Sequence, residues 1–126
     1  MTVIVTDTGF GPETWTSTDG QILDVSSDSD PVALIGQIND TQMVRVDFPS
    51  FADGRGFTIA RQLRLMGFSG RLRARGHVLA DQYAMARRSG FDEVEIDDDL
   101  AARQPEPQWL ARADWQAHDY QSRLRG

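Results

Sequence analysis

The chain of 126 residues is 40% hydrophobic and 25% charged, contains no Cys and no Lys, and carries a net charge of −6. These values are typical of one globular domain; they exclude disulfides, thiolate catalysis and lysine Schiff bases within this chain, and they disfavour nucleic acid as a partner. Because no apolar run reaches the roughly 20 residues of a membrane helix and the N-terminus lacks the basic region of a secretory signal, we expect a cytoplasmic protein with no membrane partner.

Residues 1–20 are expected to be irregular. Val3–Val5 is a short apolar strand, and the Gly-, Pro- and Thr-rich sequence after it indicates a loop. The next segment, Gln21–Val25, has the composition of a second strand. We expect this strand to begin a series of β-α repeats that extends to residue 97.

A short helix is expected at residues 31–38. Asp30 is a good N-cap, and Pro31 suits the first helical position. The same residues have the composition of a buried strand, and the cap is what favours the helix. The helix would turn three apolar side chains inward, Leu34, Ile35 and Ile38.

From residue 43 onward, strands alternate with helices. Strands are expected at 43–48, 71–75 and 94–97, and helices at about 55–66 and 79–89. Both helices end in Gly-Phe, and a glycine after the last turn adopts the left-handed conformation at little cost. The pattern predicts a small single-domain α/β fold with a mainly parallel sheet and right-handed crossovers.

The strands alternate apolar and charged residues, so we expect the helices to cover mostly one face of the sheet. A parallel sheet covered on both faces would have continuous apolar strands instead. The charged face would meet water, a second layer or another subunit, and its side chains would pair across strands. This face is expected to carry Arg45, Asp47, Arg71, Arg73, Arg75, Glu93, Glu95 and Asp97.

A last amphipathic helix is expected at residues 108–124, after a Pro-rich link at 104–107. Trp115 lies off the apolar stripe of this helix, and aromatic residues are enriched at interfaces. Two interpretations remain open: the helix docks on a partner or on a second copy in a homodimer, or Trp115 is simply a half-buried side chain. The candidate interface residues are Trp109, Trp115 and Tyr120.

The carboxyl ends of the strands predict a ligand-binding rim. Two interpretations of Asp53-Gly54-Arg55, at the start of the helix at 55–66, remain open. Free helix N–H groups and the guanidinium would form a small anion site; alternatively, Asp53 caps the helix and Arg55 is solvated. Residues 51–91 carry eight Arg and two acids, which would attract an anion locally or pair with the acidic flanks of the same domain.

A second candidate at this rim is His77, which follows Gly76 at the end of a predicted strand. Asp81 lies about one helical turn further on, where its carboxylate would tune the imidazole; alternatively, His77 is an ordinary loop residue near a helix start. The three adjacent acids Asp97–Asp99 are more typical of a solvated helix cap than of a Mg²⁺ site, so no metal is expected. The candidate ligand residues are Asp53, Gly54, Arg55, Gly76, His77, Asp81 and Gln82.

Three motifs of this region, "DFPSFADGR", "VLADQ" and "SGFDEVEI", together resemble a family of small bacterial proteins of unknown function. Its members are encoded beside assimilatory sulfite reductase and commonly carry the label of oxidoreductases in sulfite reduction. The resemblance covers about Val44 to Ile96 and brings no established catalytic residues. The matching hallmark residues are Asp47, Phe48, Pro49, Phe51, Asp53, Gly54, Arg55, Gly76, Asp81, Gln82, Gly90, Phe91 and Asp92.

The resemblance implies a role in sulfur assimilation, with sulfite reductase or another protein of that pathway as the partner. Relatives often have Cys where this chain has Ser89, so a thiol role does not extend to it. Electron transfer needs a cofactor, and the sequence firmly implies none. We therefore expect an accessory or binding protein; the alternatives are a small oxidoreductase subunit with a noncovalent flavin or nucleotide, and an assembly scaffold.

Overall fold

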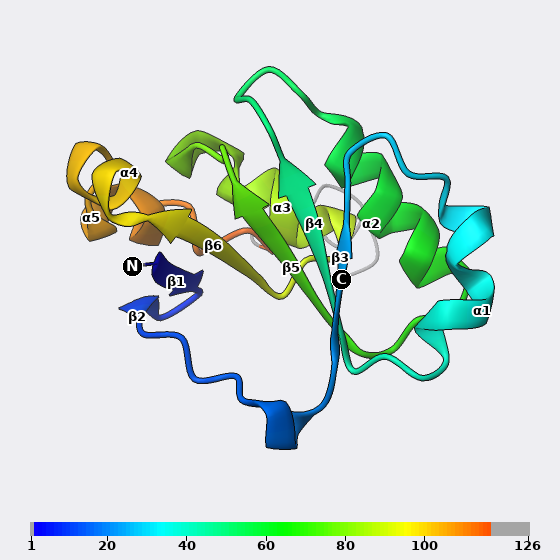
Figure 1. Ribbon diagram of the computed structural model, residues 1–126. Coiled ribbons are helices and arrows are strands. Elements are labelled where there is room, and N and C mark those ends of the chain that lie inside the picture. Colours follow the sequence, from blue (N-terminus) through cyan, green and yellow to red (C-terminus); the bar gives the residue numbers. More distant parts are fainter. Residues whose placement is uncertain (1, 117–126) are drawn as a thin grey trace.

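A six-stranded mixed sheet forms the centre of the molecule, as seen in a computed structural model that describes residues 2–116 (Figure 1). The strand order is β2-β1-β6-β5-β4-β3. The strands are β1 (Thr2–Thr6), β2 (Gly9–Gly11), β3 (Ile22–Val25), β4 (Met43–Phe48), β5 (Arg71–Gly76) and β6 (Glu93–Asp97). Strands β3 to β6 are parallel, whereas β1 runs antiparallel to β6 and β2 antiparallel to β1. The expected mainly parallel sheet is confirmed, and β2 is an addition.

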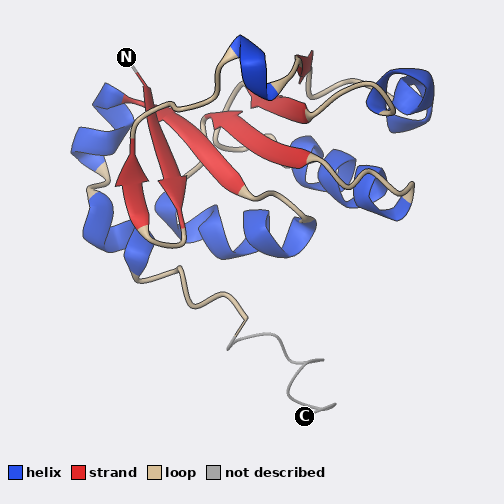
Figure 2. Cartoon of the chain, turned by 90° about the horizontal axis from the view of Figure 1, so that it is seen from below, coloured by secondary structure: helices blue, strands red, loops and turns tan. Residues whose placement is uncertain are grey.

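The connections between the parallel strands all move one place in the same direction, so right-handed crossovers put the main helices on one face. Figure 2 shows these helices gathered along that face. The α-helices are α1 (Ile35–Ile38), α2 (Arg55–Leu65), α3 (Tyr83–Ser89), α4 (Asp98–Arg103) and α5 (Glu106–Leu110). Short 3₁₀ helices are η1 (Ser17–Asp19), η2 (Pro31–Leu34) and η3 (Ala80–Gln82). None of the helices described is long and apolar enough to cross a membrane.

Both long crossover helices end as expected. Gly67 and Gly90 have φ of 99° and 117°, conformations that favour glycine. The amides of Phe68 and Phe91 each donate to the carbonyl five residues earlier, at 3.0 and 3.1 Å, and both rings are buried. This arrangement closes each helix and directs the chain into the next strand.

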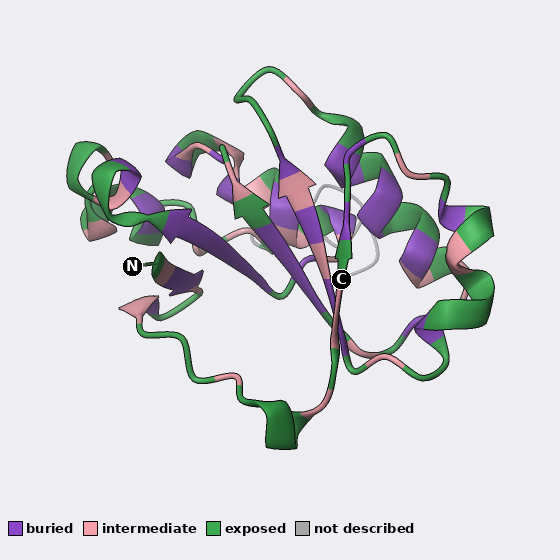
Figure 3. Cartoon of the chain, in the orientation of Figure 1, coloured by how far each residue is buried: buried purple, intermediate pink, exposed green. Residues whose placement is uncertain are grey.

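The core lies between the sheet and its helices (Figure 3). Its sheet side is formed by side chains with 1% exposure or less, among them Val44, Val46, Leu72, Ala74, Val94 and Ile96. The short helix expected at 31–38 exists, and Asp30 accepts a 3.0 Å bond from the amide of Val32. Ile38 is buried, but the inward position expected for Ile35 is wrong, because its side chain is 49% exposed. The preceding η2 has a 3₁₀ period, which changes the phase of the apolar residues.

The charged face of the sheet is partly covered by the chain itself. Residues 12–20, here named the N-terminal strap, cross this face. Within it, the carboxylate of Glu13 binds Arg73, and the ring of Trp15 lies 5.5 Å from the guanidinium of Arg71. The charged face was expected to meet water, a second layer or another subunit. Over Arg71 and Arg73 of β5 it is covered by a second layer, which the N-terminal strap provides.

Most of the Arg side chains in residues 51–91 form ion pairs with acidic residues of the same domain, so they are not free to attract an anion. Five of the eight Arg in residues 51–91 pair with acids outside that segment: Arg64, Arg71, Arg73, Arg75 and Arg87. The basic segment is therefore largely neutralised by its acidic flanks.

The continuous helix expected at 108–124 is not formed, because α5 ends at Leu110 and turns follow up to residue 116. Trp109 is buried in the core at 1% exposure, which corrects its assignment as an interface candidate. Trp115 folds back onto α3, where its ring lies 4.8 Å from the guanidinium of Arg87. Tyr120 and the rest of that expected helix lie outside the described residues.

Asp7, in the β1–β2 turn, joins the N-terminal hairpin to α3 and to the segment after α5. Its carboxylate accepts hydrogen bonds from Tyr83 at 2.5 Å, Arg87 at 3.1 Å and Trp115 at 3.3 Å. Burial raises the pKa of Asp7, but these hydrogen bonds outweigh it and hold the pKa below its ordinary value. The ionised form is thus favoured by folding.

An Asp7→Asn variant is expected to lose about 1 kcal/mol of unfolding free energy at pH 7, a value reduced for solvent screening. A carboxyl whose pKa is lowered by folding stabilises above its unfolded pKa of about 3.9 and loses that contribution as the pH falls through the folded pKa. The difference between wild type and variant should therefore shrink below pH 4 in urea unfolding curves. An equal difference at pH 7 and pH 3 would contradict this role, and the exposed Asp40→Asn serves as control.

Candidate functional site

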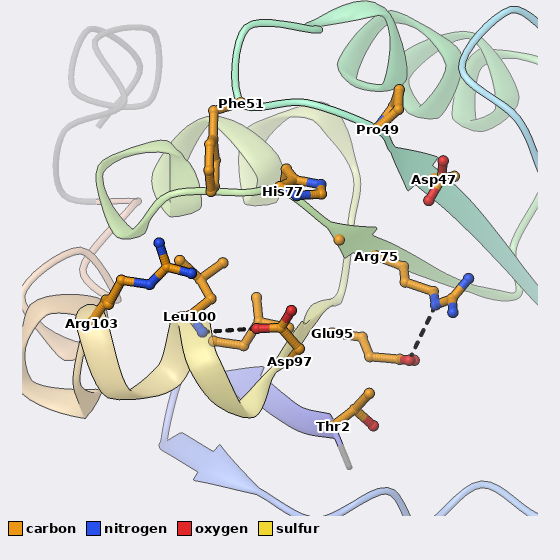
Figure 4. Close-up of a pocket in the computed structure, with 12 residues that line it drawn as sticks. Thr2, Asp47, Pro49, Phe51, Arg75, His77, Glu95, Asp97, Leu100 and Arg103 are labelled. Atoms are coloured by element: carbon orange, nitrogen blue, oxygen red, sulfur yellow. Dashed lines mark hydrogen bonds and ion pairs between the residues drawn. The ribbon is translucent and has the colours of Figure 1, made fainter.

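A pocket of about 520 Å³ lies beyond the carboxyl ends of β4, β5 and β6 (Figure 4). We call it the rim pocket. Its volume falls within the range of small-molecule sites, and its position is the one expected for ligands of α/β sheets. Its charged or titratable lining comes from Asp47, Arg75, His77, Glu95, Asp97 and Arg103.

His77 is held in one orientation at this pocket. Its backbone amide and its ring Nδ1 both bond to the carbonyl oxygen of Phe48, at 2.9 and 3.1 Å. Since a carbonyl oxygen only accepts, the hydrogen-bond network assigns the ring proton to Nδ1, and the neutral imidazole keeps its lone pair on Nε2. The ring of Phe51 packs against the imidazole edge to face, with centroids 5.0 Å apart. His77 therefore presents Nε2 as its free nitrogen.

Gly76 makes this orientation possible. Its φ of 112° favours glycine, and a Cβ at this position would lie 2.8 Å from the carbonyl oxygen of Phe48. The close approach brings the end of β5 against the end of β4, so that His77 reaches the Phe48 carbonyl. The expected candidate Gly76 thus acts through the backbone.

Gln82 links the two loops that meet at His77. Its side-chain oxygen accepts from the amide of Leu79 at 2.9 Å, and its Nε2 donates to the carbonyl of Phe51 at 3.3 Å. The "DFPSF" and "VLADQ" motifs are therefore in contact, and together they support His77.

Asp53 and Arg55 form an ion pair with each other outside the rim pocket. The guanidinium of Arg55 binds both carboxylate oxygens, at 3.0 and 2.8 Å, and also donates to Ser27 at 3.0 Å. Hydrogen bonds from the Arg55 side chain and amide hold the pKa of Asp53 well below its usual range. The N-cap position of α2 falls on Gly54, one residue after the expected cap, but the Asp53 carboxylate still accepts at 3.1 Å from the amide of Arg55, the first residue of the helix. An anion would bind Arg55 only in competition with Asp53.

Asp81 does not contact His77, which corrects the expected pair. It lies in the 3₁₀ helix η3, its side chain is 80% exposed, and its carboxylate binds Arg112 at 2.9 Å. The shorter period of this helix turns Asp81 away from the rim. The sequence-predicted candidates thus separate into the Asp53–Arg55 pair, the exposed Asp81, and the His77 cluster at the pocket.

Several pocket residues were missed as site candidates because α4 was not expected. Arg103 ends this helix, and Leu100 and Asp97 line the pocket beside it. Asp97 caps α4 by accepting from the amide of Leu100 at 2.8 Å, as a solvated cap would. Acids at the first turn and an Arg at the last are the sequence signal that would have identified the helix. Within residues 2–116, no group of three or more His, Asp or Glu side chains is placed to hold a metal.

The family model described as "Bacterial protein of unknown function (DUF934)" matches residues 23–126. The chain belongs to the DUF934 family. This confirms the resemblance to a bacterial family of unknown function and extends it beyond Val44–Ile96, while strands β1 and β2 and the N-terminal strap precede the DUF934 match. Comparisons with curated proteins and with solved structures give no significant match.

Proposed function

We propose that the protein is an accessory binding protein of sulfur assimilation that acts with sulfite reductase in the cytoplasm. In this proposal the rim pocket is the ligand site, and the loops around it contact the partner. The reaction belongs to the reductase, and this chain supplies recognition.

The observation that supports this proposal most directly is the convergence of the two hallmark motifs on His77. The imidazole at the mouth of the pocket bonds to the backbone carbonyl of Phe48 and packs against the ring of Phe51, and Gly76 permits the close approach of the two strand ends. Gln82 bonds to the carbonyl of Phe51 and so fixes the loop that carries this ring beside the exposed His77. The link to sulfite reductase comes from the resemblance of the same motifs to proteins encoded beside that enzyme.

The experiment is a binding assay between the full chain and purified sulfite reductase from the same organism. We expect the wild type to retain the reductase and Phe51→Ala to lose at least tenfold in affinity, because Phe51 is 37% exposed at the rim. Leu65→Ala is the matched control, since Leu65 is 81% exposed at the opposite end of α2. If the wild type shows no association with the reductase, the partner proposal fails. Equal losses of affinity in the two variants would show that the reductase does not bind specifically at the rim.

A further inference from the structure

The rim pocket holds two charged side chains that the domain leaves unpaired. Arg103 is exposed and Asp47 is half-buried, and neither forms an ion pair or a side-chain hydrogen bond with another described residue. This contrasts with the other polar side chains nearby, since Arg75 binds Glu95 at 3.4 Å and Asp97 caps α4. Together with Nε2 of His77, the pocket therefore keeps one cationic donor group and two acceptor groups for a ligand.

The two unpaired groups lie on different sides of the pocket. Figure 4 shows Arg103 on the α4 side and Asp47 at the end of β4, with His77 and Phe51 above the space between them. A ligand that satisfies both needs an anionic group at one end and hydrogen-bond donors at the other. Guanidinium is suited to phosphate, and a carboxylate accepts from neighbouring hydroxyls.

The volume of the pocket sets the size of this ligand. A water molecule takes about 30 Å³ in the liquid, so a tetrahedral oxyanion of five heavy atoms would leave most of the 520 Å³ to water. The pocket lining also includes three apolar residues, Pro49 on the Asp47 side, Phe51 beyond His77, and Leu100 on α4 (Figure 4). A bare sulfate or phosphate uses neither the volume nor the apolar residues.

We propose that the rim pocket binds a nucleoside monophosphate. Its phosphate accepts from Arg103, its ribose hydroxyls donate to Asp47, and its base packs against Pro49, which lies on the Asp47 side of the pocket (Figure 4). The inference rests on the proposal that the rim pocket is the ligand site, and it names the ligand class for that site.

Calorimetric titration of the full chain with AMP tests the ligand class. We expect AMP to bind and Arg103→Gln to weaken it by about tenfold to hundredfold, as loss of a charge-assisted hydrogen bond does. Arg61→Gln is the matched control, because Arg61 is exposed on α2, outside the pocket, and has no acidic partner among the residues described. Asp47→Asn should weaken AMP and ribose 5-phosphate and leave inorganic phosphate unchanged, with Asp40→Asn as its control.

Adenosine, ribose 5-phosphate and inorganic phosphate separate the parts of the ligand. Weaker binding of each fragment than of AMP supports the inference. Inorganic phosphate that binds as tightly as AMP overturns it, because only oxyanion recognition would remain. No heat with AMP, or equal affinity for wild type and Arg103→Gln, overturns it as well. Association with sulfite reductase is measured separately, so nucleotide binding without that association leaves this inference standing and removes only the partner proposal.

Discussion

Trp109→Ala is expected to lower the unfolding free energy by about 3–5 kcal/mol, as other truncations of large aromatic core residues do. The indole is 1% exposed and meets the ring of Tyr83 edge to face at 6.1 Å. Its Nε1 donates to the carbonyl of Gln104 at 2.8 Å, which ties α5 to the end of α4. Urea unfolding followed by circular dichroism measures the loss.

Two comparison variants identify the cause. Trp109→Phe keeps most of the apolar contact and should lose less than the alanine variant. Trp115→Ala removes a half-buried ring that contacts Arg87 and Asp7, and about 1–2 kcal/mol is expected. Because Trp109 faces the core, its replacement should not alter the native mass measured by light scattering. A stable Trp109→Ala variant with a changed oligomeric state would contradict the core assignment and support Trp109 as an interface residue.

Arg73→Met is expected to cost about 3–5 kcal/mol, the range measured when one partner of a buried ion pair is removed. Arg73 is 2% exposed and binds Glu93 at 2.6 Å and Glu95 at 2.8 Å. Burial lowers the pKa of Arg73, but its bonds to the glutamates outweigh burial and raise it, so the guanidinium stays charged. Without it, two glutamates with 5% exposure or less lose their shared cation.

Arg71→Met provides the matched control for this loss. Arg71 has the same chemistry and lies two residues earlier on β5, but its side chain is 47% exposed and its bond to Glu93 is 3.3 Å. A loss below about 1 kcal/mol is expected there. Adding Glu93→Gln to Arg73→Met should restore part of the stability, because it removes a buried charge whose remaining ion pair among the described residues is with the exposed Arg71. Equal losses in the two single variants would show that burial of the ion cluster contributes nothing.

The β-α repeats were predictable because the alternation of apolar and charged residues in the strands and the glycines that end the helices indicate the same element boundaries. Strands β4 to β6 alternate apolar and charged residues, and the Gly-Phe stops end α2 and α3 as expected. The same pattern predicted the charged face and its pairing. These signals are local, so each strand and helix could be predicted from its own residues.

The antiparallel placement of β1 was not predictable, because its partner β6 lies about ninety residues away and no local pattern identifies it. The ion pair between Asp53 and Arg55 was not predictable either. The sequence shows that the two residues are two positions apart, but only the folded turn shows that the carboxylate binds the guanidinium. The rim itself was predictable from topology. Which side chains line it depended on α4, whose residues had been assigned to no helix or strand.

The pairing of β1 with β6 also has a consequence for synthesis. Val3 is made before its partner Ile96, with the strands β3, β4 and β5 made in between. Strands β3 to β6 each pair with the strand made just before or after them, so they can assemble as they emerge. The outer edge of β6 stays open until the waiting N-terminal hairpin returns to close it. Strand β1 is thus made before β3 to β6 but takes its place in the sheet after them.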